Sequence, residues 1–137
     1  MKNIVENNKL LAEFLEFEKV KFLNGCYTFI IPDYLSHGEY KNLTLEDNKE
    51  VVAWDVENLI FHKDWNWLME VVEKIHGMRS YGVLINPNGT YIQDEDDKVI
   101  CMTFKNEEVN GEIISSSNIE ATFNCCAEFV KWLNKNK

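Results

Sequence analysis

The chain has 137 residues, a mass of 16.1 kDa and a formal net charge of −9, and 45% of its residues are hydrophobic. This length fits one domain with its own core, so we expect a single globular domain over residues 1–137. The apolar content argues against a disordered chain. The negative charge disfavours direct binding to nucleic acid, because a phosphate backbone requires clustered Lys and Arg.

The amino-terminal segment and the cysteines indicate the compartment. Residues 1–14 lack the apolar core and the cleavage site of a secretory signal, and no later segment approaches the length of about 18 apolar residues that a membrane span needs. We therefore expect a cytoplasmic protein that does not contact a membrane. Reduced thiols fit best and a metal site is unsupported, because no C-x-x-C pair occurs among the four cysteines: Cys26, Cys101, Cys125 and Cys126.

The first third of the chain predicts a helix, a strand and a long loop. Apolar residues with a period of 3.6 predict a helix over Asn3–Lys19. The β-branched and aromatic run Cys26–Ile31 stops at a proline and predicts a strand. Asp33–Asn48 shows no period and is expected to be a loop, in which His37 is a candidate binding residue beside two tyrosines. Two further short strands are expected: Lys49–Trp54 and Leu59–Phe61.

The most distinctive segment is an amphipathic helix after Phe61. Asp64 can accept hydrogen bonds from the free amides of its first turn, and Gly77 is expected to close it. Five apolar side chains have the spacing of one helical face, which we expect to enter the core: Trp65, Leu68, Met69, Val72 and Ile75.

Trp67 does not belong to that face, because two helical residues rotate a side chain by roughly 200°. Three interpretations stay open: Trp67 packs beneath a neighbouring loop, it anchors an interface or a ligand, as tryptophan often does, or the first turn of the helix is irregular. His62, just before the helix, is a further candidate binding residue. It cannot share a ligand with His76 at the other end, about 21 Å away on a straight helix.

The second half of the chain predicts antiparallel strands and a final helix. Tyr81–Ile85 and Thr90–Gln93 flank the turn sequence Asn86-Pro87-Asn88-Gly89, which predicts a hairpin. Two more strands are expected: Lys98–Phe104 and Glu112–Ile114.

The final helix is expected over Ser117–Asn134, lying across the sheet. Ser117 and Glu120 have the spacing of a capping box. The complete set of elements predicts an α+β fold, with a mainly antiparallel sheet of about four to six strands and about three helices packed mostly on one face.

One basic residue has distinctive chemistry. Arg79 is the only arginine among 14 basic residues, and only a guanidinium offers a planar fork for a phosphate or a carboxylate. Arg79 and the nearby Tyr81 are therefore candidate ligand-binding residues, with a surface salt bridge as the alternative for the arginine.

Known catalytic and cofactor motifs are missing from the sequence. It contains no G-x-G-x-x-G, Walker A, H-E-x-x-H or G-x-S-x-G pattern, and the acidic run Asp94–Asp97 lacks the spacing of a calcium loop. We expect neither a cofactor nor a metal, and binding is favoured over catalysis.

Two helical regions carry a resemblance. Phe61–Ile75 reads FHKDWNWLMEVVEKI, and Asn118–Ala121 and Glu128–Asn134 read NIEA and EFVKWLN. Together with the opening LLAEFLEF, these segments resemble a family of small uncharacterised phage and prophage proteins. The resemblance implies a phage setting and brings no catalytic residues with it.

We therefore expect a non-enzymatic, phage-type binding protein that sequesters a host factor or a nucleotide immune signal in the host cytoplasm. The alternative is an acidic protein or nucleic-acid mimic that blocks a basic host protein through the acid-rich segment Thr44–Glu73. An unrecognised small hydrolase is a third possibility. A homo-oligomer is compatible with each of them.

Overall fold

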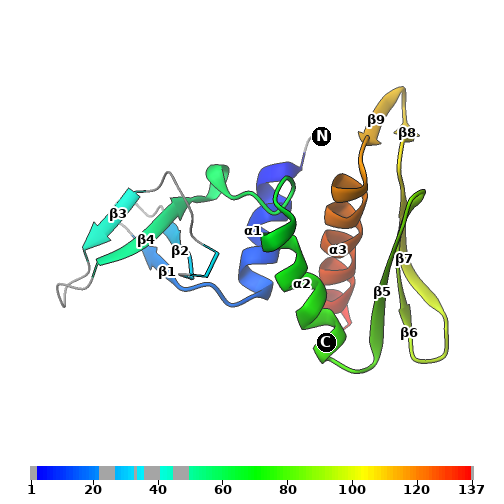
Figure 1. Cartoon of the computed structure of the whole chain (residues 1–137), viewed down its shortest axis with the longest axis horizontal. Coiled ribbons are helices and arrows are strands. Elements are labelled where there is room, and N and C mark those ends of the chain that lie inside the picture. The colour runs from blue at the N-terminus through cyan, green and yellow to red at the C-terminus, as the bar shows by residue number, and fades with distance from the viewer. Residues whose placement is uncertain (1–2, 22–26, 33, 36–40, 45–49, 137) are drawn as a thin grey trace.

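The computed structural model describes residues 3–21, 27–32, 34–35, 41–44 and 50–136. In these residues the helices form a layer between two antiparallel sheets (Figure 1). The helices are α1 (Ile4–Phe14), α2 (Trp65–Gly77) and α3 (Asn118–Lys135), with the short 3-10 helix η1 (Val56–Asn58) before α2.

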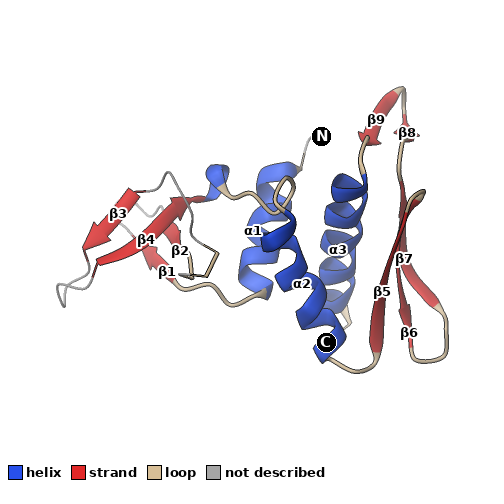
Figure 2. Cartoon of the chain, in the orientation of Figure 1, coloured by secondary structure: helices blue, strands red, loops and turns tan. Residues whose placement is uncertain are grey.

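The strands belong to three antiparallel sheets (Figure 2). The first has the order β1-β2-β4-β3, from β1 (Lys19–Lys21), β2 (Tyr27–Ile30), β3 (Lys41–Thr44) and β4 (Glu50–Asp55). The second has the order β5-β6-β7, from β5 (Tyr81–Asn86), β6 (Gly89–Asp94) and β7 (Val99–Phe104). The third is a hairpin of β8 (Glu107–Val109) and β9 (Glu112–Ser115).

The predicted α+β class is confirmed, with three helices and antiparallel strands in the described residues. The strands divide among separate sheets because the helix layer lies between the first two (Figure 1). No helix in the described part of the chain has the length and apolar character required to span a membrane.

Helix α1 ends earlier than the sequence predicted, and its end has a local cause. Glu16 adopts a left-handed φ of +61°, and the amide of Phe17 donates to the carbonyl of Ala12 at 3.0 Å. This is the hydrogen bond of a Schellman motif, which terminates a helix. The turn delivers Phe17 into the core, where it is 7% exposed.

Helix α2 begins as predicted, with the Asp64 carboxylate accepting from the amides of Asn66 and Trp67. Its buried face differs from the predicted one, because Trp65 and Met69 are 39% and 37% exposed. The side chains that enter the core are these: Trp67, Leu68, Val71, Val72 and Ile75. The face is therefore rotated by roughly 70° from the prediction.

Three local predictions were wrong. Leu59–Phe61 is not a strand, and Lys41–Thr44, placed in a loop by the sequence, is β3. Gly77 is the last residue of α2 and Arg79 takes the left-handed conformation after it, with φ +66° and its amide bonded to the carbonyl of His76 at 3.1 Å. An arginine thus occupies the position that glycine usually fills.

The β5–β6 hairpin confirms the predicted turn, with Asn86 paired to Gly89. Gly89 is required there because β7 approaches it closely. A Cβ on Gly89 would lie 2.5 Å from the carbonyl oxygen of Thr103 and 2.9 Å from the Cα of Phe104.

Helix α3 lies between the other helices and the β5-β6-β7 sheet. Its start confirms half of the predicted capping box: Ser117 Oγ accepts from the Glu120 amide at 3.2 Å, while the Glu120 carboxylate reaches Ser116 instead. Because α3 has neighbours on two sides, it buries a wide arc: Ala121, Thr122, Phe123, Cys125, Cys126, Ala127, Phe129 and Val130.

Adjacent residues of α2 test the observed face. Leu68→Ala should lower the free energy of unfolding by about 2 to 5 kcal/mol, because it removes a fully buried side chain and leaves a cavity. Met69→Ala should change it by less than about 0.5 kcal/mol. Urea unfolding of both variants measures this, and equal losses would contradict the orientation of α2.

Candidate functional site

Trp67 lies at the centre of an aromatic cluster. Its side chain is 0% exposed, and its ring centroid is 5.0 Å from that of Trp54, 5.1 Å from that of Phe61 and 6.2 Å from that of Phe17. The indole Nε1 donates to the carbonyl of Leu35 at 3.1 Å. The ring is therefore both packed and hydrogen-bonded.

This environment corresponds to the first interpretation of Trp67, packing beneath a loop. Leu35 is itself 3% exposed and covers the indole. A fully buried side chain offers no area to a partner without rearrangement of the core. The tryptophan of α2 that does reach the surface is Trp65.

Trp65 belongs to an exposed surface that we call the α2 ridge, defined by Tyr34, Trp65, Met69, Glu70 and Glu73. Trp65 and Met69 are one helical turn apart, so their exposed side chains adjoin on the same face. Tyr34 is 70% exposed, the highest value among the large hydrophobic side chains of the described residues. Exposed aromatic side chains of this kind are favoured anchors of protein interfaces.

Acidic groups lie beside Tyr34, and Glu73 is one helical turn from Met69. The Tyr34 hydroxyl is hydrogen-bonded to Glu70, and its pKa is raised by burial and by the charges of Glu70 and Glu73. Among the described residues, no Lys or Arg pairs with either glutamate. The ridge therefore combines apolar area with negative charge that is available to a partner.

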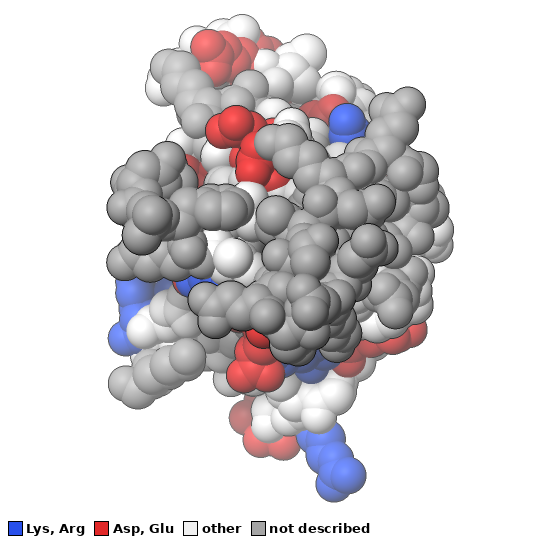
Figure 3. All heavy atoms as spheres, turned by 90° about the vertical axis from the view of Figure 1, so that its left-hand side faces the viewer, with Lys and Arg blue, Asp and Glu red and all other residues white. Residues whose placement is uncertain are grey.

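The acid-rich segment Thr44–Glu73 is only partly described. Glu46 and Asp47 lie outside the described residues, whereas Asp55 and Glu57 are described near the end of β4. Acidic side chains are also visible on the end of the molecule formed by the first sheet (Figure 3).

His62 has a structural role in the described residues. Its Nδ1 lies 2.9 Å from the Asn8 amide nitrogen, and Asn8 Oδ1 accepts from the amide of Phe61 at 2.9 Å. Because that second bond fixes the Asn8 amide, Nδ1 must act as an acceptor and remain unprotonated. Burial lowers the pKa of His62 below 6.5, the charge of Lys63 lowers it further, and Glu120 partly offsets the shift.

Arg79 and Tyr81 do not form a common anion site. Arg79 is exposed, and no described residue accepts a hydrogen bond from its guanidinium or forms an ion pair with it. The Tyr81 ring packs edge-on against Phe129 and Trp132, at centroid distances of 5.0 and 6.0 Å. His37 lies outside the described residues.

Tyr81 and Trp132 line a cleft of about 380 Å³ at the end of the second sheet. Three of its four charged side chains are acidic, namely Asp94, Glu95 and Asp96, and the fourth is Lys98. This rim is unfavourable for a phosphate group, which a nucleotide ligand would bring.

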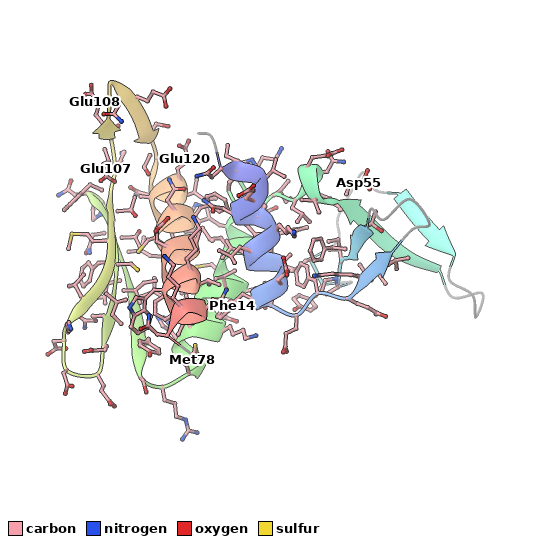
Figure 4. All side chains as sticks on the ribbon, turned by 180° about the vertical axis from the view of Figure 1, so that it is seen from behind. Phe14, Asp55, Met78, Glu107, Glu108 and Glu120 are labelled. Atoms are coloured by element: carbon pink, nitrogen blue, oxygen red, sulfur yellow. The ribbon has the colours of Figure 1, made fainter. Side chains whose placement is uncertain are left out.

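A second cleft, of about 550 Å³, opens where the three helices end. Figure 4 labels Phe14 and Met78 there. The ammonium group of Lys74 donates to the carbonyl of Phe14 and lies 4.7 Å from the centre of its ring. Among the described residues that line this cleft, Lys74 is the only lysine, and it is bonded to the last carbonyl of α1.

The described thiols are poor nucleophiles. Burial raises the pKa of Cys101 to about 11 and that of Cys125 to about 12, and it raises the pKa of Cys126 as well. Thiols with such pKa values stay protonated near neutral pH. No group of three or more His, Cys, Asp or Glu that could hold a metal occurs in the described part of the chain.

No protein-family model, curated protein or solved structure matches this chain. The geometry of the chain itself is therefore the basis for assigning a function. Sequence reasoning assigned Trp65 to the core and so missed the ridge. A signal for it exists in the sequence, since two tryptophans separated by one residue cannot share a helical face.

Removal of Trp67 distinguishes packing from partner contact. Trp67→Ala should lower the free energy of unfolding by about 3 to 5 kcal/mol and leave the molecular mass unchanged, because the indole fills the core. Trp65→Ala is the matched control and should cost far less. Thermal unfolding beside light scattering measures both, and a changed mass with intact stability for Trp67→Ala would contradict this assignment.

The His62 contact makes stability dependent on pH. Since the folded state holds the pKa of His62 below 6.5, the unfolded chain takes up the proton first as the pH falls. The stability from neutral His62 should therefore be complete above about pH 6.5 and decrease below it. His62→Gln keeps an acceptor for Asn8 that does not titrate, so its urea midpoint should fall less between about pH 7.5 and about pH 5.5. Equal falls for both proteins would refute the role of His62.

Proposed function

We propose that this protein acts without catalysis, by sequestering a host protein that has a basic surface. The α2 ridge is the contact surface in this proposal. The observation that carries it is the exposure of Trp65 and Met69, at 39% and 37%, on the helix that also carries Glu70 and Glu73, which have no basic partner among the described residues. The setting is the one that the resemblance implies, a phage product acting against a factor of its bacterial host.

The chemistry of the ridge fits such a partner. The indole of Trp65 and the thioether of Met69 offer apolar area, which supplies most of the affinity at an interface. Glu70 and Glu73 attract Lys and Arg, which favours fast association and selection of basic partners. This combines the sequestering role with the acidic contact surface expected from Thr44–Glu73.

The geometry gives less support to a nucleotide ligand. Arg79 does not form a common anion site with Tyr81, and the cleft beside Tyr81 is lined mainly with carboxylates. It also gives little support to a hydrolase, because the described histidines are engaged. His62 accepts from Asn8 and His76 accepts from the amide of Val83.

Self-association would strengthen the proposed capture. An oligomer presents the ridge more than once, so a partner with repeated basic sites would be bound with higher avidity.

Capture from an extract of the bacterial host tests the proposal. The full chain should retain a basic protein, and Trp65→Ala should reduce the retained amount at least tenfold, because it removes the main apolar anchor. Glu70→Gln combined with Glu73→Gln should weaken retention mainly at low salt, where charge attraction is least screened.

Met78→Ala is the matched control, because Met78 is also 39% exposed but lies beyond the end of α2, outside the ridge. It should retain the partner fully. Equal retention by wild type and Trp65→Ala would refute the ridge as the contact surface. A nucleotide found by native mass spectrometry in place of a protein would refute the proposed class of partner.

A further inference from the structure

The two edge strands of the β5-β6-β7 sheet differ in whether a side chain covers their outward-facing backbone groups. At the β5 edge, the amide of Val83 donates to His76 Nε2 at 3.0 Å, and the same nitrogen lies 3.4 Å from the Val83 carbonyl oxygen. Because Nε2 accepts from the amide, it has no proton for that carbonyl, so the imidazole bonds the outward-facing amide of Val83 and lies beside its carbonyl. It protects that edge from pairing with another strand.

The same contact fixes which backbone groups of β7 face outward. In an antiparallel ladder the N–H and C=O of a residue point to one side, and the side alternates along the strand. Val83 points away from β6, so its partner Ile92 points toward β7, where it pairs with Cys101. Cys101 therefore points toward β6, and the backbone groups of Met102 and Phe104 point to the outer edge.

Apart from a register shift that leaves Ile100 unpaired with β6, this outer edge lacks the usual protection. Val99–Phe104 contains no charged residue, proline or glycine. Within the described residues, no strand pairs with the outer side of β7. Val99, Met102 and Phe104 are also 42%, 47% and 53% exposed. Natural edge strands that are long, apolar and uncharged are sites of pairing between chains.

We propose that β7 pairs with β7 of a second copy of this chain, antiparallel and about a two-fold axis at Thr103. A two-fold axis brings the same patch of both copies together, so the contact is self-complementary and closes as a dimer. In this register the N–H and C=O groups of Met102 face those of Phe104 in the other copy, and their side chains adjoin on the open face of the sheet.

A second copy also fits the charges at the ends of β7. Lys98 precedes the strand, and Glu107 and Glu108 follow it in β8, beyond its other end (Figure 4). Antiparallel pairing brings Lys98 of each copy toward the two glutamates of the other. The centre of the contact, Val99–Phe104, carries no charged side chain that would oppose pairing of like copies. Since His76 blocks the β5 edges, the assembly ends at two copies.

Light scattering after size exclusion tests this proposal on the full chain. Wild type should elute with twice the chain mass of 16.1 kDa. Met102→Lys and Phe104→Lys should each reduce the mass to that of one chain, because a charged side chain on the edge opposes pairing. Ile85→Lys is the matched control, since Ile85 is a 38% exposed strand residue in β5, at the opposite edge of the same sheet, and it should leave the mass doubled.

Amide hydrogen exchange on wild type provides a test that needs no variant. The amides of Met102 and Phe104 should exchange at least tenfold more slowly at high protein concentration than after strong dilution. A wild-type mass of one chain at high concentration would overturn the proposal. A doubled mass in both lysine variants would overturn the assignment to β7.

Discussion

The burial of the Trp67 indole fixes the rotation of helix α2, and this rotation decides which side chains of the helix enter the core and which reach the surface. Trp67 contacts rings from the turn after α1, from β4 and from the segment before α2, and its N–H satisfies the carbonyl of Leu35. Such ring pairs contribute about 0.5 to 1.5 kcal/mol each beyond the burial of apolar area. Because Trp67 is committed to this cluster, Trp65 must point away from it. The same rotation that builds the core therefore places an aromatic side chain on the surface.

The sequence predicted the existence of α2 and its first residue but not its rotation. The apolar side chains of this helix span an arc of roughly 200°, wider than the face that the core accepts. One choice of face contains Trp65 and Met69, the other Trp67 and Val71, and both contain the same three aliphatic residues. The choice was settled by Phe17 and Leu35, which are distant in sequence. No local period could identify these neighbours.

Local chemistry was predicted well wherever a side chain bonds its own backbone, as at Asp64 and Ser117. It was predicted poorly where the backbone adopts a conformation against residue preference. Glu16 and Arg79 take left-handed φ values that glycine would adopt more easily, so the ends of α1 and α2 were misplaced. Of the candidate site, Arg79, Tyr81 and His62 proved to be separate, and the exposed ridge appeared only when the packing of α2 was known.

The proposed capture of a basic partner and the orientation of α2 depend on the same fact, which is that Trp67 is inside and Trp65 is outside. The indole N–H resonances report this directly, because a buried and hydrogen-bonded N–H exchanges slowly with solvent. Measured by NMR in the unliganded protein, the indole N–H of Trp67 should be strongly protected from exchange and that of Trp65 should exchange rapidly. Protection of Trp65 with rapid exchange at Trp67 would contradict the core, the ridge and the function built on them.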